Sequence, residues 1–400
     1  MSTKTKIEKK YFSKYKKPLV EFPNLLETQL ASYKWLIEHG LKEVFKEFSP
    51  INDYSEKKFM LEFTSFSLGE PKFDEYYAKA NKLTYDAQLK ARVKLMNKTL
   101  GGSSKEQEIF LADIPLMTDH GTFIINGVER VIVSQLARSF GVFFTDLDLK
   151  GKKLFGAKII PARGVWIEIE SDSDGVLYVR IDKKRKFSIT SLLRVLGFTD
   201  ESMLAAAATD EVRHILKLSI EKDPAKTSDE SFIEIYKRLR DGDLATTENA
   251  KEFINSLFSS ERYDLSPVGR FRFNKRFGKP MTDKDLERRT ISKEDLMVIV
   301  EHIISLNNTP NSKADDIDHL GQRRVRYVGE LLQQKIRVGM TQIKRNIQDR
   351  MSTIDVATAL PINIINQRPL QARIKEFFST NQLSQFMNQE NVLSEIEHSR

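Results

Sequence analysis

The spacing of apolar residues predicts strands and helices along most of the chain. Between residues 25 and 48 apolar positions recur every three or four residues, as in an amphipathic helix, and Pro23 and Asn24 stand where such a helix begins. Over 59–66 and 80–97 apolar and polar residues alternate, which predicts strands. Within 121–133, Asn126-Gly127 separates two β-branched runs and predicts a hairpin turn, because both residues accept positive φ.

A second hairpin is predicted over 165–182, with its turn at 171–175. Its first strand places Val165, Ile167 and Ile169 on one face, so Trp166 projects from the opposite, polar face. The residues alone leave two interpretations of this indole open. A neighbouring loop covers part of it, as is common for single exposed apolar residues, or it is offered to a ligand that stacks.

After residue 189 the pattern becomes helical, with predicted helices over 189–196, 211–220, 231–240, 250–258 and 295–306. The polar segment 309–312 then predicts a domain boundary. A long helix follows over 328–351, with basic residues opposite its apolar stripe. Gly339 inside this helix predicts close packing or a bend, since glycine costs about 1 kcal/mol relative to alanine there. A last helix is predicted around 372–378.

Residues 377–398 are rich in glutamine, asparagine and aromatic side chains. This composition suits one wall of a larger polar cavity better than a surface tail. Because the segment stops two residues before the end of the chain, we expect the chain to be cut in the middle of a structure.

Composition limits the class of protein. The 400 residues are 40% apolar and contain no apolar run near eighteen residues, so we expect a soluble protein of two or three domains. The basic N-terminus is not followed by the apolar segment of a secretion signal, which predicts an intracellular protein. The chain has no cysteine, and its six histidines lack a partner at helical spacing. We therefore expect no metal site on it.

The formal net charge of +8 is concentrated in two places. Residues 1–20 contain seven lysines and one glutamate, a net charge of +6 that leaves +2 for the rest of the chain. A second excess lies within 321–350, where Glu330 and Asp349 face eight basic residues: Arg323, Arg324, Arg326, Lys335, Arg337, Lys344, Arg345 and Arg350. Clustered charge can neutralise phosphates, so this cluster favours phosphate contact over a solvated face.

Several local motifs do not support the function that they first suggest. The segment 172–175 resembles part of a calcium loop, but with Glu170 at its first position the twelfth is Ile181, where a glutamate is needed. A turn is therefore expected there. The basic run 183–186 follows a strand and is expected to be a solvated turn rather than a localisation signal. No nucleophile elbow and no phosphate-binding loop are present.

The acidic group Asp315, Asp316, Asp318 and His319 lies on a predicted loop. Consecutive carboxylates on a loop rarely converge on one ion without further ligands. We expect them to cap the backbone or to pair with Arg323 and Arg324.

Longer motifs carry a family resemblance. They are KEQE at 105–108, IPLMTD at 114–119, GTFIING at 121–127, ERVIVSQL at 129–136, RYDLS at 262–266, VGR at 268–270 and DDIDHLG at 315–321. Together they resemble the N-terminal region of the β subunit of bacterial DNA-directed RNA polymerase over nearly the whole chain.

The resemblance implies an α+β fold of two domains, with mixed helices and antiparallel sheets. A lobe domain, 141–313, is inserted into a discontinuous protrusion domain made of 1–140 and 314–376, and 377–400 is the truncated start of the rifamycin-binding and fork region. These domains would form a jaw of the cleft that holds downstream DNA. The enzyme is a nucleotidyltransferase whose catalytic Mg²⁺ lies on the β′ subunit, so this segment is expected to hold no catalytic residue and no cofactor.

The resemblance also implies two sets of site residues. A pocket for a base of the non-template DNA strand would be lined by Arg138, Trp166, Ile317, Asp318 and Arg323. A stacking aromatic, a carboxylate that accepts from a base edge and arginines that neutralise the backbone suit a flipped guanine.

The second set lies in the segment that resembles the rifamycin-binding region, on the RNA side of the active centre. It consists of Gln382, Gln385, Phe386, Asn388 and His398, with a helix at Leu383. Three residues depart from the family. Asn388 stands where aspartate is usual, which leaves rifamycin sensitivity open, and Val392 and Phe140 each replace a common proline.

The implied partners are DNA, RNA and the β′, α, omega and sigma subunits, in the cytoplasm and without a membrane. An alternative of a different class is a free-standing nucleic-acid-binding protein that retains only protrusion and lobe, which the coding sequence beyond Arg400 would distinguish. A third interpretation, a soluble α/β scaffold, leaves the basic cluster and the asparagine-rich C-terminal segment unexplained.

Overall fold

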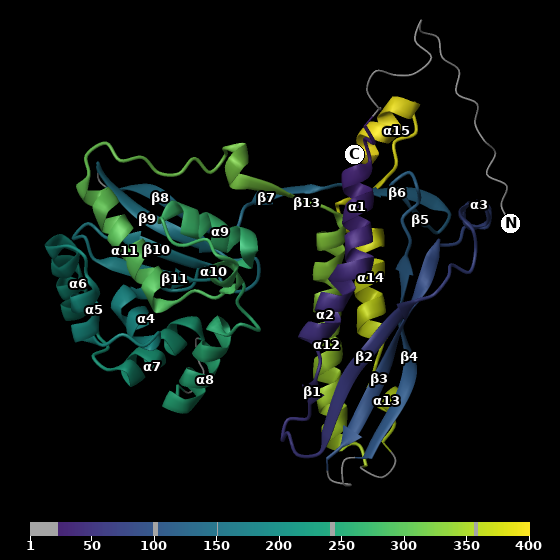
Figure 1. Cartoon of the computed structure of the whole chain (residues 1–400), viewed down its shortest axis with the longest axis horizontal. Coiled ribbons are helices and arrows are strands. Elements are labelled where there is room, and N and C mark those ends of the chain that lie inside the picture. The colour runs from purple at the N-terminus through teal and green to yellow at the C-terminus, as the bar shows by residue number, and fades with distance from the viewer. Residues whose placement is uncertain (1–22, 99–102, 150, 241–244, 356–358) are drawn as a thin grey trace, which may run out of the picture. The chain divides into compact units, whose positions relative to one another are not determined.

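The computed structural model describes residues 23–98, 103–149, 151–240, 245–355 and 359–400. The chain divides into two compact units, of which unit 1 comprises Met1–Leu136 and Val325–Arg400 and unit 2 comprises Ala137–Arg324 (Figure 1). It crosses between them inside β7 (Gln135–Arg138) and β13 (Arg323–Arg326), which pair with each other. Mixed helices and antiparallel sheets confirm the predicted α+β fold class.

The unit boundaries differ from the expected domain limits at 140/141 and 313/314. The segment 309–312, predicted as a domain boundary, forms a turn with Asn311 at φ 62° and lies inside unit 2. The physical reason is that backbone and side-chain contacts hold residues 315–322 to unit 2, as described below. Residues 377–400 are grouped with unit 1.

Unit 1 contains two antiparallel sheets. The larger has β1 (Ile51–Asn52), β2 (Phe59–Leu68), β3 (Asp86–Asn97) and β4 (Ser103–Pro115) in that order, and the smaller has the order β14 (Ser384–Phe386), β6 (Val128–Ile132), β5 (Phe123–Ile125). Its helices are α1 (Glu27–Trp35), the π-helix Leu36–Gly40, α2 (Leu41–Glu47), α3 (Glu75–Ala80), α12 (Val328–Thr353), α13 (Pro361–Ile364), α14 (Arg368–Thr380) and α15 (Val392–Ser399).

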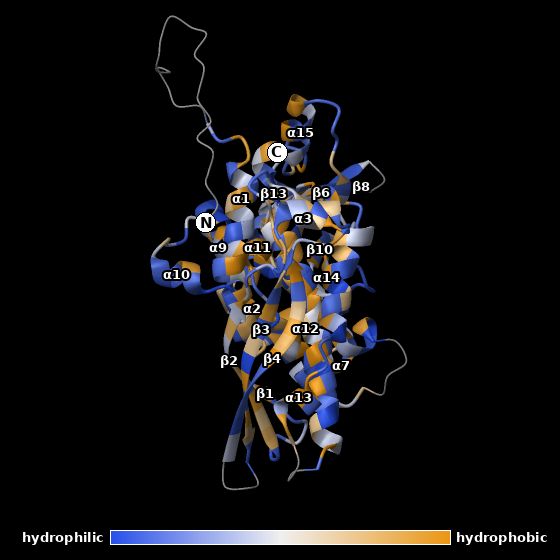
Figure 2. Cartoon of the chain, turned by 90° about the vertical axis from the view of Figure 1, so that its right-hand side faces the viewer, coloured by the Kyte–Doolittle hydropathy of each residue, from blue (hydrophilic) through white to orange (hydrophobic). Residues whose placement is uncertain are grey.

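The core of unit 1 lies between the larger sheet and the long helix α12. Polar and apolar residues alternate along β3 (Figure 2), and every second residue of this strand is buried. The apolar stripe predicted for α12 is buried in the same core. Figure 1 shows α14 running beside α12. Gly339 permits this approach, because a Cβ there would meet Leu370 Cα at 2.9 Å, which confirms the predicted close packing.

Two local predictions in unit 1 can be compared directly with the structure. The hairpin turn is confirmed, since Ile125 pairs with Val128 and Asn126 and Gly127 have φ of 52° and 79°. The strand predicted over 80–97 begins only at Asp86. The preceding residues end α3 and turn, with positive φ at Lys82.

Unit 2 contains one five-stranded antiparallel sheet in the order β12 (Phe187–Ser188), β11 (Leu177–Ile181), β10 (Ile167–Ser171), β9 (Lys152–Ile160), β8 (Gly141–Leu149). Its helices are α4 (Ile189–Val195), α5 (Asp200–Ala206), α6 (Asp210–Lys222), α7 (Ser228–Leu239), α8 (Thr247–Phe258), α9 (Ser266–Arg276), α10 (Asp283–Glu287), α11 (Lys293–Asn308) and the 3₁₀ turn Leu320–Gln322.

One face of the unit 2 sheet builds the core. Val142, Phe144, Ile167 and Ile169 from this face pack with buried residues of the helical layer, including α6 and α7. Several helices begin at a threonine or serine whose hydroxyl accepts a first-turn N–H: Thr199, Thr209, Thr227, Thr246 and Ser292. The five helices predicted between 189 and 306 are confirmed, whereas β8, β9, α5, α9 and α10 were not predicted. The other face of the sheet carries the candidate site.

Candidate nucleic-acid interface

Trp166 lies on the face of the unit 2 sheet opposite the core. It directly precedes β10, where Ile167 and Ile169 point into the core, so strand alternation places Trp166 on the same face as Glu168. Its side chain is 38% exposed, and Glu168 beside it pairs with Lys158 at 3.2 Å. This confirms the predicted hairpin and the prediction that the indole projects from the polar face.

The backbone of Trp166 is held from both sides by Asp182 at the end of β11. The Trp166 N–H donates to the Asp182 carboxylate at 3.1 Å, and the Asp182 N–H donates to the Trp166 carbonyl at 3.0 Å. Sequence analysis did not single out Asp182. Its position opposite Trp166 follows from the hairpin register, which pairs Ile167 with Ile181, so the register was the signal that would have found it.

The segment 315–322 is attached to the same sheet through Asp315. The Asp315 N–H donates to the Phe144 carbonyl at 2.9 Å, and its carboxylate accepts the Phe144 N–H at 2.7 Å. Arg276 of α9 pairs with both oxygens of this carboxylate, at 2.7 and 2.9 Å. Asp315 therefore caps a backbone N–H, which is one of the two predicted alternatives, and its ion pair is formed with Arg276 of α9 rather than with Arg323 or Arg324.

Further contacts hold the other end of this segment. Arg272 of α9 donates to the Gly321 carbonyl at 2.8 Å and also bonds to Gln322. The Ser139 N–H donates to the Gln322 carbonyl at 2.9 Å. The backbone N–H of Asp318 is accepted by Asp316 at 2.9 Å, as the capping prediction requires. Arg272 and Arg276 were missed by sequence analysis, since nothing in the local sequence links α9 to this segment.

Ile317 lines a cleft of about 270 Å³ on the polar face of the sheet. Its other walls come from β8, β9 and β10 and include Thr145, Lys158, Glu168 and Glu170. Trp166 and Ile317 thus belong to one face, while Asp318 is exposed next to Ile317.

Arg138 and Arg323 lie on the paired strands β7 and β13 and are both half-buried. The bond between Ser139 and Gln322 joins the residues next to them. In an antiparallel sheet, the starts of β8 and β10 and the ends of β9 and β11 lie at the same end. Arg138, which leads into β8, and Trp166, which leads into β10, therefore lie at one end of the sheet. Predicted residues thus come from three segments far apart in sequence. Trp166 and Ile317 belong to the polar face, and Arg138 and Arg323 lie toward the end of the sheet at which Trp166 stands.

The second set of predicted residues lies together in unit 1. The Nδ1 atom of His398 accepts the Asn388 backbone N–H at 3.1 Å, so the proton of the neutral ring is on Nε2, which lies 3.1 Å from the Gln385 side-chain oxygen. The Gln385 amide in turn donates to the Gln382 carbonyl at 3.3 Å. Phe386 is 63% exposed, with the Arg130 guanidinium 4.3 Å from its ring centre.

The helix predicted at Leu383 is absent, which corrects the sequence analysis. The residues after it form β14, which pairs with β6. The Leu383 carbonyl accepts the Val133 N–H at 2.8 Å, so its backbone is already engaged by the sheet edge.

The basic cluster of 321–350 is partly neutralised. Arg326 pairs with Glu330 at 3.1 Å. Lys335 pairs with Glu376 at 3.4 Å and Arg337 with Glu47 at 3.0 Å, so two of these carboxylates come from other elements. Phosphate contact by this cluster stays a prediction, with less free charge than the sequence indicated. The lysines of residues 1–20 lie outside the described residues.

Among the described residues, histidines and carboxylates do not gather in groups of three or more that could hold a metal ion. No helix in the described part of the chain is both long and apolar enough to cross a membrane.

Three matches to known proteins agree with the family resemblance of the sequence motifs. Residues 139–326 match the family model "RNA polymerase Rpb2, domain 2", a range that nearly coincides with unit 2. The chain is 44% identical over 392 residues to the DNA-directed RNA polymerase subunit beta of Syntrophomonas wolfei, covering 97% of this chain and 34% of the relative. It is 42% identical over 428 residues to that of Chloroflexus aggregans, covering 99% and 35%. The chain spans about a third of the length of these relatives. Residues 139–326 are therefore similar to Rpb2 domain 2, and nearly the whole chain is similar to about a third of bacterial RNA polymerase β subunits.

Proposed function

We propose that the chain works as the N-terminal part of a β subunit in a cytoplasmic DNA-directed RNA polymerase. Such an enzyme is a nucleotidyltransferase that joins ribonucleoside triphosphates on a DNA template. The identity of 42–44% over nearly the whole chain supports this proposal. The proposed partners are the β′, α, omega and sigma subunits, and the catalytic Mg²⁺ would be held by β′ rather than by this segment.

Within that assembly, unit 2 would form part of a jaw of the DNA cleft and bind an unpaired base of the non-template strand. The observation that carries this is the 38% exposed indole of Trp166 on the polar face of a sheet. A nucleobase gains about 1–3 kcal/mol by stacking on such a ring. Arg138 and Arg323 at the same end offer charge to the flanking phosphates, and the exposed Asp318 carboxylate offers an acceptor for a base edge.

Replacing Trp166 with alanine tests this function directly. We expect Trp166→Ala to weaken binding of the chain to a guanine-containing single-stranded oligodeoxynucleotide by about 1–3 kcal/mol, a factor of roughly 5 to 150 in Kd. Trp35→Ala is the matched control, because Trp35 is 36% exposed but belongs to unit 1. Equal affinities for the wild type and Trp166→Ala would sink the proposal. In the assembled enzyme the same substitution should weaken base preference in open-complex footprints.

A second contact, to nascent RNA or to rifamycin, is proposed for the segment 382–398 of unit 1. The connected amide and imidazole groups of Gln385, Asn388 and His398 support it, together with the exposed ring of Phe386. Phe386→Ala is expected to reduce affinity for a short oligoribonucleotide by about 1–3 kcal/mol. Tyr76→Ala, which removes an 85% exposed ring elsewhere in unit 1, is expected to have no effect. The same loss in both variants would argue against a specific site.

A further inference from the structure

The turn that follows β11 carries four consecutive basic residues, Lys183, Lys184, Arg185 and Lys186, all of them exposed. From sequence alone this run is a solvated turn. The structure gives it a specific neighbour, because the turn begins at Asp182, whose carboxylate and N–H both bond to the backbone of Trp166. The basic turn and the exposed indole are therefore parts of one local structure.

The turn is held in a defined conformation. Asp182 and Lys183 have φ of 48° and 60°, in the left-handed region, and the Lys184 N–H donates to the Ile181 carbonyl at 3.0 Å. The two hydrogen bonds between Asp182 and the Trp166 backbone, one donated by each residue, hold this conformation next to the start of β10. The backbone that carries these lysines is consequently fixed next to the start of β10.

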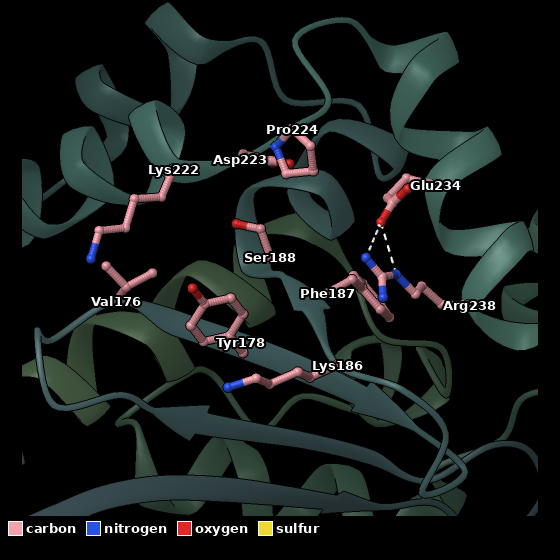
Figure 3. A pocket seen from close by; sticks show the side chains of 10 residues that line it. All are labelled: Val176, Tyr178, Lys186, Phe187, Ser188, Lys222, Asp223, Pro224, Glu234 and Arg238. Atoms are coloured by element: carbon pink, nitrogen blue, oxygen red, sulfur yellow. Dashed lines mark hydrogen bonds and ion pairs between the residues drawn. The ribbon is translucent and has the colours of Figure 1, made fainter.

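The cations of this turn are not equivalent. Lys186 lies against the ring of Tyr178, with its Nζ 4.5 Å from the ring centre (Figure 3). The other cations around that small cavity, of about 80 Å³, are already engaged, since Lys222 pairs with Asp174 at 2.6 Å and Arg238 with Glu234 at 2.8 Å.

Lys183 and Lys184 occupy the tip of the turn and are exposed. Within the part of the chain that the structure describes, neither ammonium group is paired with a carboxylate. The one carboxylate inside the turn, Asp182, is occupied by the Trp166 N–H. The tip therefore offers two free positive charges on a turn that is bonded to the backbone of Trp166.

We propose that Lys183 and Lys184 bind the phosphodiester backbone of the single DNA strand whose base stacks on Trp166. The inference rests on the proposed function and deepens it, since it adds contacts to backbone phosphates from a turn outside the predicted site residues. Single-strand binding sites combine an aromatic platform with cations that follow the backbone. An acidic peptide would use the charges but not the indole, so the combination favours nucleic acid.

The salt dependence of binding separates phosphate contact from stacking. With the full chain and a twelve-nucleotide guanine-containing oligodeoxynucleotide, fluorescence anisotropy over a salt series gives the slope of log K against log salt. Each phosphate neutralised on a single strand contributes about 0.7 to that slope, so Lys183→Gln/Lys184→Gln should reduce its magnitude by about 1.4. The preference for guanine should not change. Trp166→Ala should lower affinity and leave the slope intact.

The matched control is Lys217→Gln/Lys237→Gln, which removes the same charge from exposed positions on α6 and α7, the helices that cover the core face. This control should retain the wild-type slope. A wild-type slope in the Lys183/Lys184 variant, or an equal loss of slope in the control, overturns the inference. An equal loss of affinity for a polyglutamate peptide would assign the turn to an acidic protein instead and also overturn it.

The two proposals fail differently in this experiment. If the lysine variant loses slope while Trp166→Ala binds like the wild type, the stacking function fails and the cationic turn stands. If Trp166→Ala weakens binding and the lysine variant is unchanged, only the further inference fails. A chain that binds no oligonucleotide even at low salt contradicts both.

Discussion

The substitution Asp295→Asn is expected to destabilise unit 2 strongly. Asp295, at the start of α11, pairs with Arg270 of α9 at 2.8 Å and with Lys279 at 2.7 Å. The side chains of Arg270 and Asp295 are only 3% and 5% exposed. Removing one partner of a buried ion pair costs about 3–5 kcal/mol, because it leaves an uncompensated charge. Arg270 keeps two carbonyl acceptors, those of Arg288 and Thr290, so we expect about 3 kcal/mol.

The two tryptophans allow unit 2 to be followed separately. Trp35 belongs to unit 1 and Trp166 to unit 2, so in a Trp35→Phe background the fluorescence of Trp166 reports on unit 2. A loss of about 3 kcal/mol should move the urea midpoint by roughly 1–3 M, given m-values of about 1–3 kcal/mol/M. Asp174→Asn is the control, since it breaks the pair with Lys222, in which both side chains are solvent-exposed. A midpoint shift no larger than that of the control would refute the reasoning.

The effect of Asp295→Asn should also disappear in acid. Burial tends to raise the pKa of Asp295, but its hydrogen bonds with Lys279 and Arg270 outweigh burial and lower that pKa below its ordinary range. The stabilisation is therefore present above the unfolded-state pKa of about 3.9 and is lost as pH falls through the lower folded-state pKa. Wild type and variant should converge in stability at low pH. A difference that persists unchanged there would mean that the carboxylate charge is not its source.

Three further predictions follow from the contacts described above. Gly339→Ala should destabilise unit 1 by up to about 2 kcal/mol in urea unfolding, because crowding against Leu370 costs about 1–3 kcal/mol and helix propensity returns about 1. Asp315→Asn should break the ion pair with Arg276 and lower the stability of unit 2 by about 1.5–3 kcal/mol. It should also weaken oligonucleotide binding, because the pair helps to hold the segment 315–322. Unchanged binding would contradict this prediction. Burial and the neighbouring Arg276 lower the pKa of His302, and Asp315 opposes them. Unit 2 should therefore lose stability as pH falls below about 6.5, the ordinary pKa of histidine. His302→Phe should reduce that loss when unfolding is measured at pH 7.5 and at pH 5.5.

Helices and strands whose buried side chains are apolar and regularly spaced could be predicted from sequence. The long helix α12 and the hairpin at Asn126-Gly127 have local patterns that determine them, and both are present. Helix α9 is the opposite case. Its buried positions include Arg270 and Asn274, while Val268 and Phe271 are exposed. The spacing of its apolar residues therefore does not identify the face that is buried. What stabilises it is a carboxylate on α11, 25 residues away from Arg270, and no local window contains both partners.

Capping chemistry could have supplied some of what the apolar pattern missed. The helix α5 begins at Thr199, whose hydroxyl accepts the Ser202 N–H while the Ser202 side chain returns to the Thr199 backbone. This reciprocal arrangement is readable from the spacing of the two residues. The strands β8 and β9 are harder to predict from sequence. In β8 the neighbouring residues Phe143 and Phe144 lie on opposite faces of the sheet, and both are buried. A strand covered on both faces does not show clean alternation.

The candidate site shows the same division between local and long-range determinants. The face on which Trp166 projects follows from alternation in one hairpin, so it was predictable. The place of Ile317 and Asp318 depends on Asp315, whose partners Phe144 and Arg276 lie 171 and 39 residues away in sequence. Their position is therefore a property of the folded unit. Substitutions that loosen α9, such as Asp295→Asn, should weaken base binding as well as stability, although Asp295 lies outside the proposed interface.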